Sequence, residues 1–288
     1  MTELRSRMQG RVCLVTGATA GIGEVTALEL ARLGATVILV GRSAQKCATV
    51  VAQIKAQTNN PNLDYMVADL SRQRDIRQLV LQFKQKYTQL HVLINNAGAT
   101  FSTRQLTDEG FEMTWALNHL NYFLLTHLLL DLLKASAPAR IINVSSGAHL
   151  MGEIDFDNLQ GEKRFRGFGQ YSNSKLANVL FTYELARRLE GTNVTANVLH
   201  PGMVASNFGT NNGWIWRNVV RKAMNLFSLS VVEGASTTLY LATSPAVETV
   251  SGQYFDKKKA VPSSKVSYNT ATAARLWEVS ETMTGIKE

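Results

Sequence analysis

Two side chains that can move a proton stand close together in the stretch "YSNSK", from Tyr171 to Lys175. Residues four positions apart on a helix lie on the same face, so this phenol and this ammonium would be neighbours. A free phenol has a pKa of about 10, and a nearby positive charge favours its ionised form and lowers that pKa. The spacing therefore indicates an acid, Tyr171, beside the charge that tunes it. The alternative is an exposed helix pair with no chemical role.

A glycine-rich stretch near the N-terminus is suited to binding a dinucleotide. "TGATAGIG", residues 16–23, follows an apolar run and precedes a helical pattern. Its three glycines would let the backbone turn tightly and approach a pyrophosphate at a helix N-terminus. A tight strand-to-helix turn with no ligand is the alternative, because such turns also use glycine. The predicted cofactor contacts in this loop are Gly17, Thr19, Gly21, Ile22 and Gly23.

The residues after the second apolar run indicate which dinucleotide would bind. No Asp or Glu stands between Glu29 and Asp64, where a free ribose 2′-hydroxyl would need an acidic partner. Arg42 follows the run directly, and Lys46 comes one helical turn later. A guanidinium fork suits a phosphate dianion, so these residues predict NADP(H) rather than NAD. Alternatively, Arg42 is a solvated loop charge.

Two further runs end in residues that would line a nucleotide site. Asp69 and Leu70 follow the third run, and Asn96, Ala97 and Gly98 follow the fourth, in "NNAG". Asp69 is suited to bond the adenine amino group, and the small residues would let the chain pass beneath the adenosine ribose. Asp69 is equally suited to the start of a helix.

These residues need a scaffold that brings strand ends together. Helical spacing, as at Ile76, Leu79, Val80 and Phe83, separates short apolar runs along the chain. This alternation predicts an α/β fold with a doubly wound parallel sheet (Rossmann fold), which binds ligands at the carboxyl ends of its strands. We expect a single domain over residues 1–288 with a C-terminal extension. The predicted strands are Arg11–Thr16, Thr36–Val40, Tyr65–Ala68, His91–Asn95, Arg140–Val144 and Val194–Leu199.

Composition narrows the class of protein. The chain has 288 residues, a net charge of +8 and two cysteines, Cys13 and Cys47, with no metal-ligand spacing. The basic residues are dispersed and no nucleic-acid motif accompanies them, so no nucleic-acid partner is predicted. We see no signal peptide or apolar N-terminal anchor, and we expect a reducing, cytoplasmic location.

The order of the motifs carries a resemblance. A serine at a strand end, Ser146 in "INVSS", precedes Tyr171 and Lys175, and a Pro-Gly turn follows at residues 201–202. Asn118 stands in "ALNHLNYFL". Together with "TGATAGIG" and "NNAG", these motifs make the chain similar to the short-chain dehydrogenase/reductase family over nearly its whole length.

The resemblance implies a role for each residue. Tyr171 would protonate the alkoxide that forms when a hydride reaches a carbonyl carbon, and Ser146, preferred over Ser145, would hold the substrate oxygen. Lys175 would bind the nicotinamide ribose and, with the oxidised nicotinamide, lower the phenol pKa. Asn118 would hold a water linked to the lysine. The predicted contacts beside the nicotinamide are Pro201, Gly202, Val204 and Ser206, the last standing where the family usually has threonine.

Other segments resemble the retinol dehydrogenase subgroup. "GFEMTWALNHLNYFLLTHLLLDLLKASAPARIINVSS", "FDNLQGEK" and "ARLWEVSETMTG" carry this similarity. Residues from about 203 to 232 are expected to form a substrate lid. Within them, Trp214–Phe227 is a basic amphipathic stretch that would cover an apolar substrate, contact a membrane surface or pack on the core. Relatives suggest a homodimer through the helices around Asn118 and Tyr171, unless the longer loops block that contact.

The sequence therefore predicts an NADPH-dependent enzyme that acts on the carbonyl or alcohol of a small apolar substrate, such as a retinoid or another lipophilic aldehyde or ketone. One alternative is a reductase of a porphyrin-type or polycyclic substrate. Another is an NADP-binding regulatory protein without turnover, which would be indicated if NADPH bound but no carbonyl were reduced.

Overall fold

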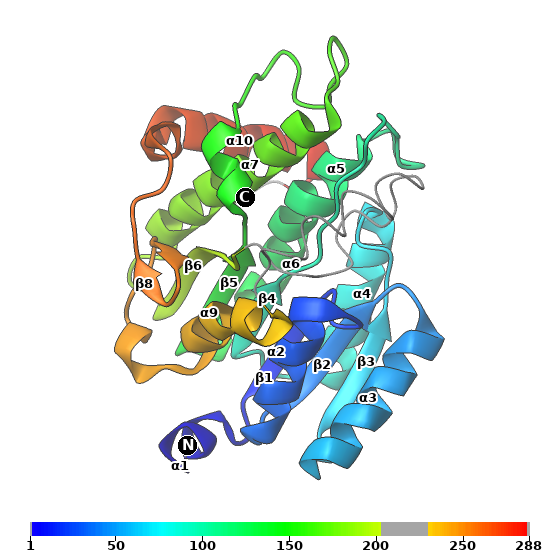
Figure 1. Cartoon of the computed structure of the whole chain (residues 1–288), viewed down its shortest axis with the longest axis vertical. Coiled ribbons are helices and arrows are strands. Elements are labelled where there is room, and N and C mark those ends of the chain that lie inside the picture. Colours follow the sequence, from blue (N-terminus) through cyan, green and yellow to red (C-terminus); the bar gives the residue numbers. More distant parts are fainter. Residues whose placement is uncertain (1, 203–229, 287–288) are drawn as a thin grey trace.

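A single sheet of eight strands organises the computed structural model, which describes residues 2–202 and 230–286 (Figure 1). The strand order is β3-β2-β1-β4-β5-β6-β7-β8, and every neighbouring pair is parallel except β7 and β8. This confirms the predicted doubly wound parallel sheet. The strands are β1 (Val12–Thr16), β2 (Thr36–Gly41), β3 (Leu63–Val67), β4 (Val92–Asn95), β5 (Ala139–Val144), β6 (Val194–His200), β7 (Tyr254–Asp256) and β8 (Lys259–Ala260).

Helices cover both faces of this sheet (Figure 1). The α-helices are α1 (Thr2–Met8), α2 (Gly21–Arg32), α3 (Ala44–Thr58), α4 (Gln73–Lys86), α5 (Met113–Trp115), α6 (Asn121–Ala135), α7 (Gly167–Arg188), α9 (Val231–Thr243) and α10 (Thr270–Thr284). The shorter helical turns of the described residues are η1 (Ala116–Leu120), η2 (Gly147–Met151), η4 (Pro245–Val247) and η5 (Lys265–Tyr268). Of these, η1 is a π-helical turn between α5 and α6.

The alternating direction of side chains along each strand explains why an apolar core lies on each face of the sheet. Leu14 packs into the core formed with α4, α6 and α7, whereas its neighbour Val15 packs into the core formed with α2, α3 and α9. Adjacent strand residues point to opposite faces, so a sheet covered on both sides needs apolar residues at consecutive positions. The five residues of β1 are all buried, as that arrangement requires.

The six predicted strands are present, with ends shifted by one or two residues. Arg11 lies before β1, and β3 begins at Leu63 rather than at Tyr65. β7 and β8 were not predicted, because runs of three and two residues carry too little periodicity to detect. They extend the sheet beyond β6. The C-terminal α10 packs against α7 through Ala273 and Leu276.

Some predictions fall outside the described residues. These are the cofactor contacts Val204 and Ser206, the amphipathic stretch Trp214–Phe227 and nearly all of the expected lid. Within residues 2–202 and 230–286, no helix has the length and apolar character needed to cross a membrane. The same residues contain no cluster of three or more His, Cys, Asp or Glu side chains able to hold a metal ion.

Candidate active site

The loops after β1 and β4 are bonded to each other. Thr16 accepts hydrogen bonds at Oγ1 from the backbone N–H groups of Asn96 (2.8 Å) and Ala97 (3.0 Å). The Asn96 amide donates in turn to the Thr16 carbonyl (2.8 Å). A Cβ added at Gly23 would lie 2.7 Å from Asn96 Nδ2 and would also collide with the carbonyl oxygen of Gly17. The predicted cofactor residues of both loops therefore form one surface, and only glycine fits at position 23.

The first turn of α2 is suited to an anion. Ala20 occupies its N-cap position, and this side chain offers no acceptor to the helix. Gly17 and Gly21 have φ values of +64° and +61°, which glycine adopts without strain. The first N–H groups of a helix without a side-chain cap can bind a pyrophosphate. Thr19 and Ile22, both half-buried, lie in the same turn.

A positive charge follows directly at the end of β2. A Cβ at Gly41, the last residue of that strand, would lie 2.7 Å from the methyl group of Thr19, so the strand end touches the glycine loop. Arg42 comes next and is exposed. Among the described residues, neither its guanidinium nor the Lys46 ammonium forms a hydrogen bond or an ion pair. Both charges are therefore available to a phosphate at this edge of the loop.

The residues after β3 already have partners. Asp69 accepts hydrogen bonds at Oδ1 from the backbone N–H (3.0 Å) and the hydroxyl (2.7 Å) of Ser71, and its Oδ2 lies 4.0 Å from Arg72 Nε. The Leu70 side chain is buried in the core under α4. Only backbone atoms of Leu70 can therefore face a nucleotide, and the adenine contact of Asp69 stays a prediction.

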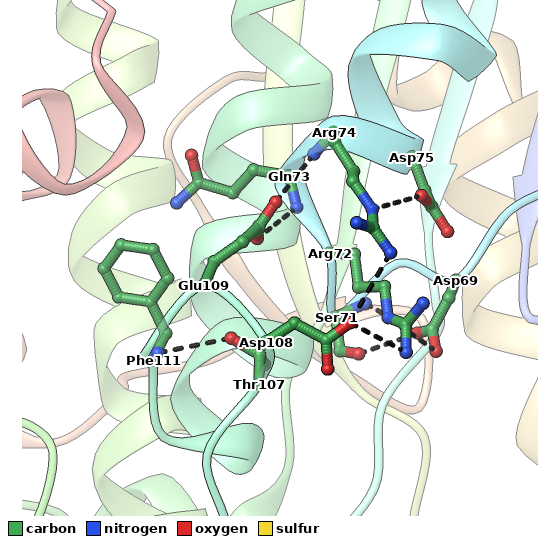
Figure 2. Close-up of polar contacts among 10 residues, drawn as sticks. All are labelled: Asp69, Ser71, Arg72, Gln73, Arg74, Asp75, Thr107, Asp108, Glu109 and Phe111. Carbon is green, nitrogen blue, oxygen red and sulfur yellow. Dashed lines mark hydrogen bonds and ion pairs between the residues drawn. The ribbon is translucent and has the colours of Figure 1, made fainter.

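A loop from a distant part of the chain caps the N-terminus of α4 at this end of the site (Figure 2). Glu109 accepts hydrogen bonds from the backbone N–H groups of Gln73 (2.7 Å) and Arg74 (3.0 Å), while the adjacent Asp108 pairs with Arg72 (3.1 Å). The N-cap residue of α4, Arg72, makes no capping bond of its own. Glu109 thus caps a helix from a different part of the chain and fixes residues 107–111 against it.

The tyrosine and lysine of the opening stretch are both buried in α7. Their exposed fractions are 7% for Tyr171 and 4% for Lys175. The Lys175 Nζ donates to the carbonyl oxygen of Val144 (2.9 Å) at the end of β5, and it lies 5.7 Å from the centroid of the Tyr171 ring. It also lies 5.6 Å from the ring centroid of Tyr122, whose hydroxyl donates to the same carbonyl (3.3 Å). Tyr122 was not among the predicted site residues.

Burial sets the proton affinities of this pair. Burial raises the pKa of Tyr171 to about 12, although a hydrogen bond with Ser146 acts to lower this pKa. Burial also lowers the pKa of Lys175 to about 7. We expected a lowered phenol pKa, so the protein alone acts in the opposite direction. Desolvation disfavours the charged form of both groups, and with a near-neutral pKa Lys175 is only partly charged at pH 7. The expected decrease in the Tyr171 pKa also depended on the positive charge of an oxidised nicotinamide. The pKa values given above describe the protein without that charge.

The buried ammonium predicts how the stability of the cofactor-free protein depends on pH. Between about pH 7 and the ordinary lysine pKa of about 10.4, the unfolded chain binds a proton that folded Lys175 releases. The free energy of unfolding should therefore rise with pH across this window, by up to about 1.4 kcal/mol per pH unit. Urea unfolding at about pH 7.5 and about pH 9 would measure the rise. Lys175→Met should flatten it, and equal slopes in both proteins would contradict the prediction.

The two serines after β5 have different environments. The Ser145 hydroxyl is buried and donates to the backbone carbonyl of Lys175 (2.7 Å), so it supports α7. Ser146 is half-buried, accepts a hydrogen bond from the backbone N–H of Ala148 (3.2 Å) and contacts the Tyr171 phenol. This difference favours Ser146 over Ser145 as the group that holds a substrate oxygen.

The neighbouring strand brings the Pro-Gly turn to the same edge. Ser145 donates its backbone N–H to the carbonyl of Leu199 in β6 (2.8 Å). Pro201 and Gly202 follow this strand and are half-buried, and Gly202 has a φ of +84°. The turn therefore begins beside the strand end that carries Ser146.

Asn118 lies in the π-helical turn η1, and its side chain clamps the loop after β4. Its Oδ1 accepts from the Ala99 backbone N–H (2.9 Å), and its Nδ2 donates to the Ala99 carbonyl (2.9 Å) and to the Ser174 hydroxyl (2.9 Å). A Cβ at Gly98 would lie 3.4 Å from Lys175 Nζ. Since the side-chain amide is engaged, the implied water would have to bind the Asn118 backbone carbonyl, which accepts one bond from Asn178 (2.9 Å).

The order and geometry of these loops match a known family. A family profile described as short chain dehydrogenase matches residues 11–213, which include the glycine loop and the predicted catalytic residues. The chain belongs to the short-chain dehydrogenase family. It is therefore an oxidoreductase, and the predicted resemblance is confirmed.

Individual members of the short-chain dehydrogenase family are similar over nearly the full length. Retinol dehydrogenase 12 of Mus musculus is 44% identical, over 98% of this chain and 88% of its own. Polyprenol dehydrogenase of Homo sapiens is 43% identical, over 96% of this chain and 86% of its own. Among solved structures, RhlG of Pseudomonas aeruginosa, in a complex with NADP, has a TM-score of 0.69 and 27% identity, over 86% of this chain and 94% of its own.

One buried carboxylate in this short-chain dehydrogenase was not among the predicted site residues. Glu112 is fully buried and accepts hydrogen bonds from the backbone N–H groups of Thr114 (3.0 Å) and Trp115 (2.8 Å) and from the Gln170 side chain (3.1 Å). It thus caps α5, which leads into the turn of Asn118, and binds the residue before Tyr171. Its position immediately before a helix start was the available signal, but its bond to Gln170 spans 58 residues and has no local pattern.

Removing this cap should cost stability. Glu112→Ala leaves two buried N–H groups without an acceptor, so we expect the free energy of unfolding to fall by about 2–4 kcal/mol. Glu109→Ala is a matched control, because Glu109 also caps a helix but is exposed to water; its loss should stay below about 1 kcal/mol. Urea unfolding would compare them, and equal losses would show that burial of Glu112 adds nothing.

Proposed function

We propose that this short-chain dehydrogenase is an NADP(H)-dependent oxidoreductase that interconverts the carbonyl and alcohol forms of a small apolar substrate, such as a retinoid or another lipophilic aldehyde or ketone. The observation that carries the proposal is the meeting of Ser146, Tyr171 and Lys175 beside the carboxyl ends of β4 and β5. A proton donor, a polar anchor and a lysine that can carry a positive charge together suit a reaction in which negative charge develops on a substrate oxygen.

The cofactor is NADP(H). The bonded loops of β1 and β4 and the uncapped first turn of α2 fit a dinucleotide pyrophosphate. Arg42 and Lys46, exposed at the end of β2, are suited to a ribose 2′-phosphate. The NADP complex of RhlG supports this cofactor. When bound, NADPH supplies the hydride.

The remaining chemistry belongs to side chains of this chain. The Ser146 hydroxyl donates a hydrogen bond to the substrate carbonyl oxygen, and the Tyr171 phenol gives that oxygen its proton as negative charge develops. The high pKa of Tyr171 keeps the phenol protonated before reaction, which suits an acid. Lys175, held on the Val144 carbonyl, then stabilises the phenolate, and Asn118 keeps the Gly98 loop against the lysine.

Apolar side chains near Tyr171 support the substrate class. Phe168 is 56% exposed, and its ring centroid lies 6.3 Å from that of Tyr171. Leu150 and Met151, at the end of η2, are also exposed. An exposed aromatic ring beside a buried acid would contact a lipophilic substrate. The names of two relatives, retinol and polyprenol dehydrogenase, describe alcohols of this class.

The test is oxidation of NADPH by the purified protein, followed by nicotinamide absorbance. The carbonyl panel would contain retinal, a long-chain aldehyde, a steroid ketone, a quinone and a short water-soluble aldehyde. We expect NADPH-selective turnover of the apolar carbonyls. NADPH binding without turnover of any panel member would contradict the proposed activity.

A matched pair of variants tests the apolar contact within the same assay. Phe168→Ser should raise KM for retinal roughly tenfold, because a large apolar contact is lost. It should leave the short aldehyde unchanged. Leu81→Ser, at a similarly exposed position on α4, should change neither KM. Equal effects on both aldehydes would contradict a substrate-contacting role for Phe168.

We also propose where the enzyme is located and how it assembles. We place it in the cytoplasm as a single NADP-binding domain, with peripheral membrane contact through Trp214–Phe227 and a homodimer through the helices around Asn118 and Tyr171. These statements stay predictions. Gel filtration coupled to light scattering would test the dimer.

A further inference from the structure

A hollow that opens to solvent lies at the opposite end of the sheet from the candidate active site. Its lining includes residues at the starts of β1, β4 and β5, whereas the glycine loop and Ser146 follow the carboxyl ends of β1 and β5. The short helix α1 borders it at the lower end of the view in Figure 1. The polar lining residues that matter here are Arg7, Arg11, His91, Arg140 and Glu248.

The charges around this hollow do not balance. Three guanidinium groups face one carboxylate, and that carboxylate, Glu248, pairs with Arg7 (2.6 Å). Arg11 donates to the carbonyl of Pro138 (3.1 Å). Arg140 donates to two backbone carbonyls, those of residues 241 and 244 (2.9 Å each). Within the described part of the chain, neither Arg11 nor Arg140 forms an ion pair.

Arg140 is half-buried, and burial is the main cause of its lowered pKa. Among the smaller charge effects, the Glu248 carboxylate raises the pKa of this guanidinium, and the charges of Arg7 and Arg11 lower it. Charges that leave bulk water are usually paired with an opposite charge. Among the residues that the structure describes, Arg11 and Arg140 have only backbone carbonyls as hydrogen-bond partners in this hollow. An anion between them would supply the missing charge.

His91 adds a neutral donor to the same lining. Its Nδ1 accepts a hydrogen bond from the backbone N–H of Val12 (3.0 Å), so the ring proton belongs on Nε2. Burial, followed by the charge of Arg11, lowers the pKa of His91, which favours the neutral ring. A neutral imidazole N–H and several guanidinium N–H groups make a set that is rich in donors and poor in acceptors.

We propose that this hollow is a binding site for a phosphate-type oxyanion, held between Arg11 and Arg140 with Arg7 and His91 at its sides. A guanidinium presents two parallel N–H groups that match two oxygens of a phosphate. The same chemistry could come from free phosphate or from the headgroup of an anionic lipid. The site is separate from the cofactor loop and does not depend on the proposed function.

Isothermal titration of inorganic phosphate into the protein tests the site. NADPH is kept at saturation so that the glycine loop is filled, and sodium chloride at equal ionic strength serves as the reference. Arg11→Gln removes a charge from the lining and should weaken phosphate binding roughly tenfold. Glu248→Gln removes the opposing carboxylate and should tighten binding severalfold. Arg140 is left intact, because it also fastens the end of α9.

Arg5→Gln is the matched control. Arg5 lies on the same helix as Arg7 and is exposed, but it does not line the hollow. Arg5→Gln changes the net charge by the same amount as Arg11→Gln. Because Arg5 lies outside the hollow, this variant should leave phosphate binding unchanged. If the arginines that line the hollow had only structural roles, Glu248→Gln would not tighten phosphate binding.

A parallel measurement distinguishes the two sources of the anion. Sedimentation with phosphatidylcholine vesicles, with and without phosphatidic acid, uses the same variants. Phosphate binding that depends on Arg11 without vesicle binding assigns a free anion. Vesicle binding that depends on both phosphatidic acid and Arg11, without phosphate binding, assigns a lipid headgroup as the ligand. If phosphate and vesicles both bind in an Arg11-dependent way, the site accepts a free anion or a headgroup. The proposal is overturned if neither binds, or if Arg5→Gln weakens binding as much as Arg11→Gln.

Discussion

Tyr171→Phe is expected to lower kcat for reduction of an apolar aldehyde roughly 10³-fold while NADPH affinity stays nearly unchanged. Phenylalanine keeps the ring that lies beside Lys175 and Phe168, so the packing of the site survives. The variant lacks only the hydroxyl that contacts Ser146. In the proposed reaction, this hydroxyl gives the substrate oxygen its proton. Steady-state kinetics with NADPH, together with a fluorescence titration of the cofactor, would measure both quantities.

Tyr183→Phe is a control for this result on the same helix. Tyr183 is also buried, and its hydroxyl bonds to Ser263 (2.7 Å), away from the candidate site. It should keep activity within about threefold of the parent, since its loss affects only a structural hydrogen bond. If Tyr171→Phe retained comparable activity, another group would have to supply the proton, and Tyr122, beside the same lysine, would be the first to replace.

The sequence predicted the parts of the site that depend on neighbours in the chain. Tyr171 and Lys175 share one turn of α7, so helical spacing alone was enough to pair them. Glycine loops carry their own signature, because Gly23 must be small for the backbone of Gly17 to pass. The sheet was predictable for a similar reason. Each buried strand is an apolar run, and parallel order follows from strand–helix alternation.

Contacts between distant segments were not predictable in the same way. Glu109 caps α4 from 36 residues away, and no local pattern distinguishes it from any other loop glutamate. Tyr122 was hidden because an aromatic residue in an apolar helix is usually core. The direction of the Tyr171 pKa was wrong for the isolated protein because it depends on burial, which spacing does not report.

One loop connects the two ends of the active site. Residues 98–112 begin at the glycine beside Lys175, where Asn118 clamps Ala99. They continue to Glu109, which caps α4 next to Asp69, and they end at Glu112, which caps α5 and binds Gln170. A change at either cap would therefore reach both the predicted adenine contact, Asp69, and α7, the helix that carries Tyr171.

Arg42→Asp is expected to weaken NADPH binding about 100-fold and to change NADH binding by less than about threefold. The guanidinium is exposed and without a partner among the described residues, so its loss should not disturb the fold. A carboxylate in its place repels a 2′-phosphate and can accept a hydrogen bond from a 2′-hydroxyl. Cofactor titrations of both proteins at low and high salt would give the ratio, and the NADPH effect should shrink as salt screens the charges. Lys55→Asp, on the last turn of α3, reverses a charge away from the loop and should alter neither affinity. Equal losses for both cofactors in Arg42→Asp would mean that this residue supports the loop itself, and the preference for NADPH would then have to come from Lys46.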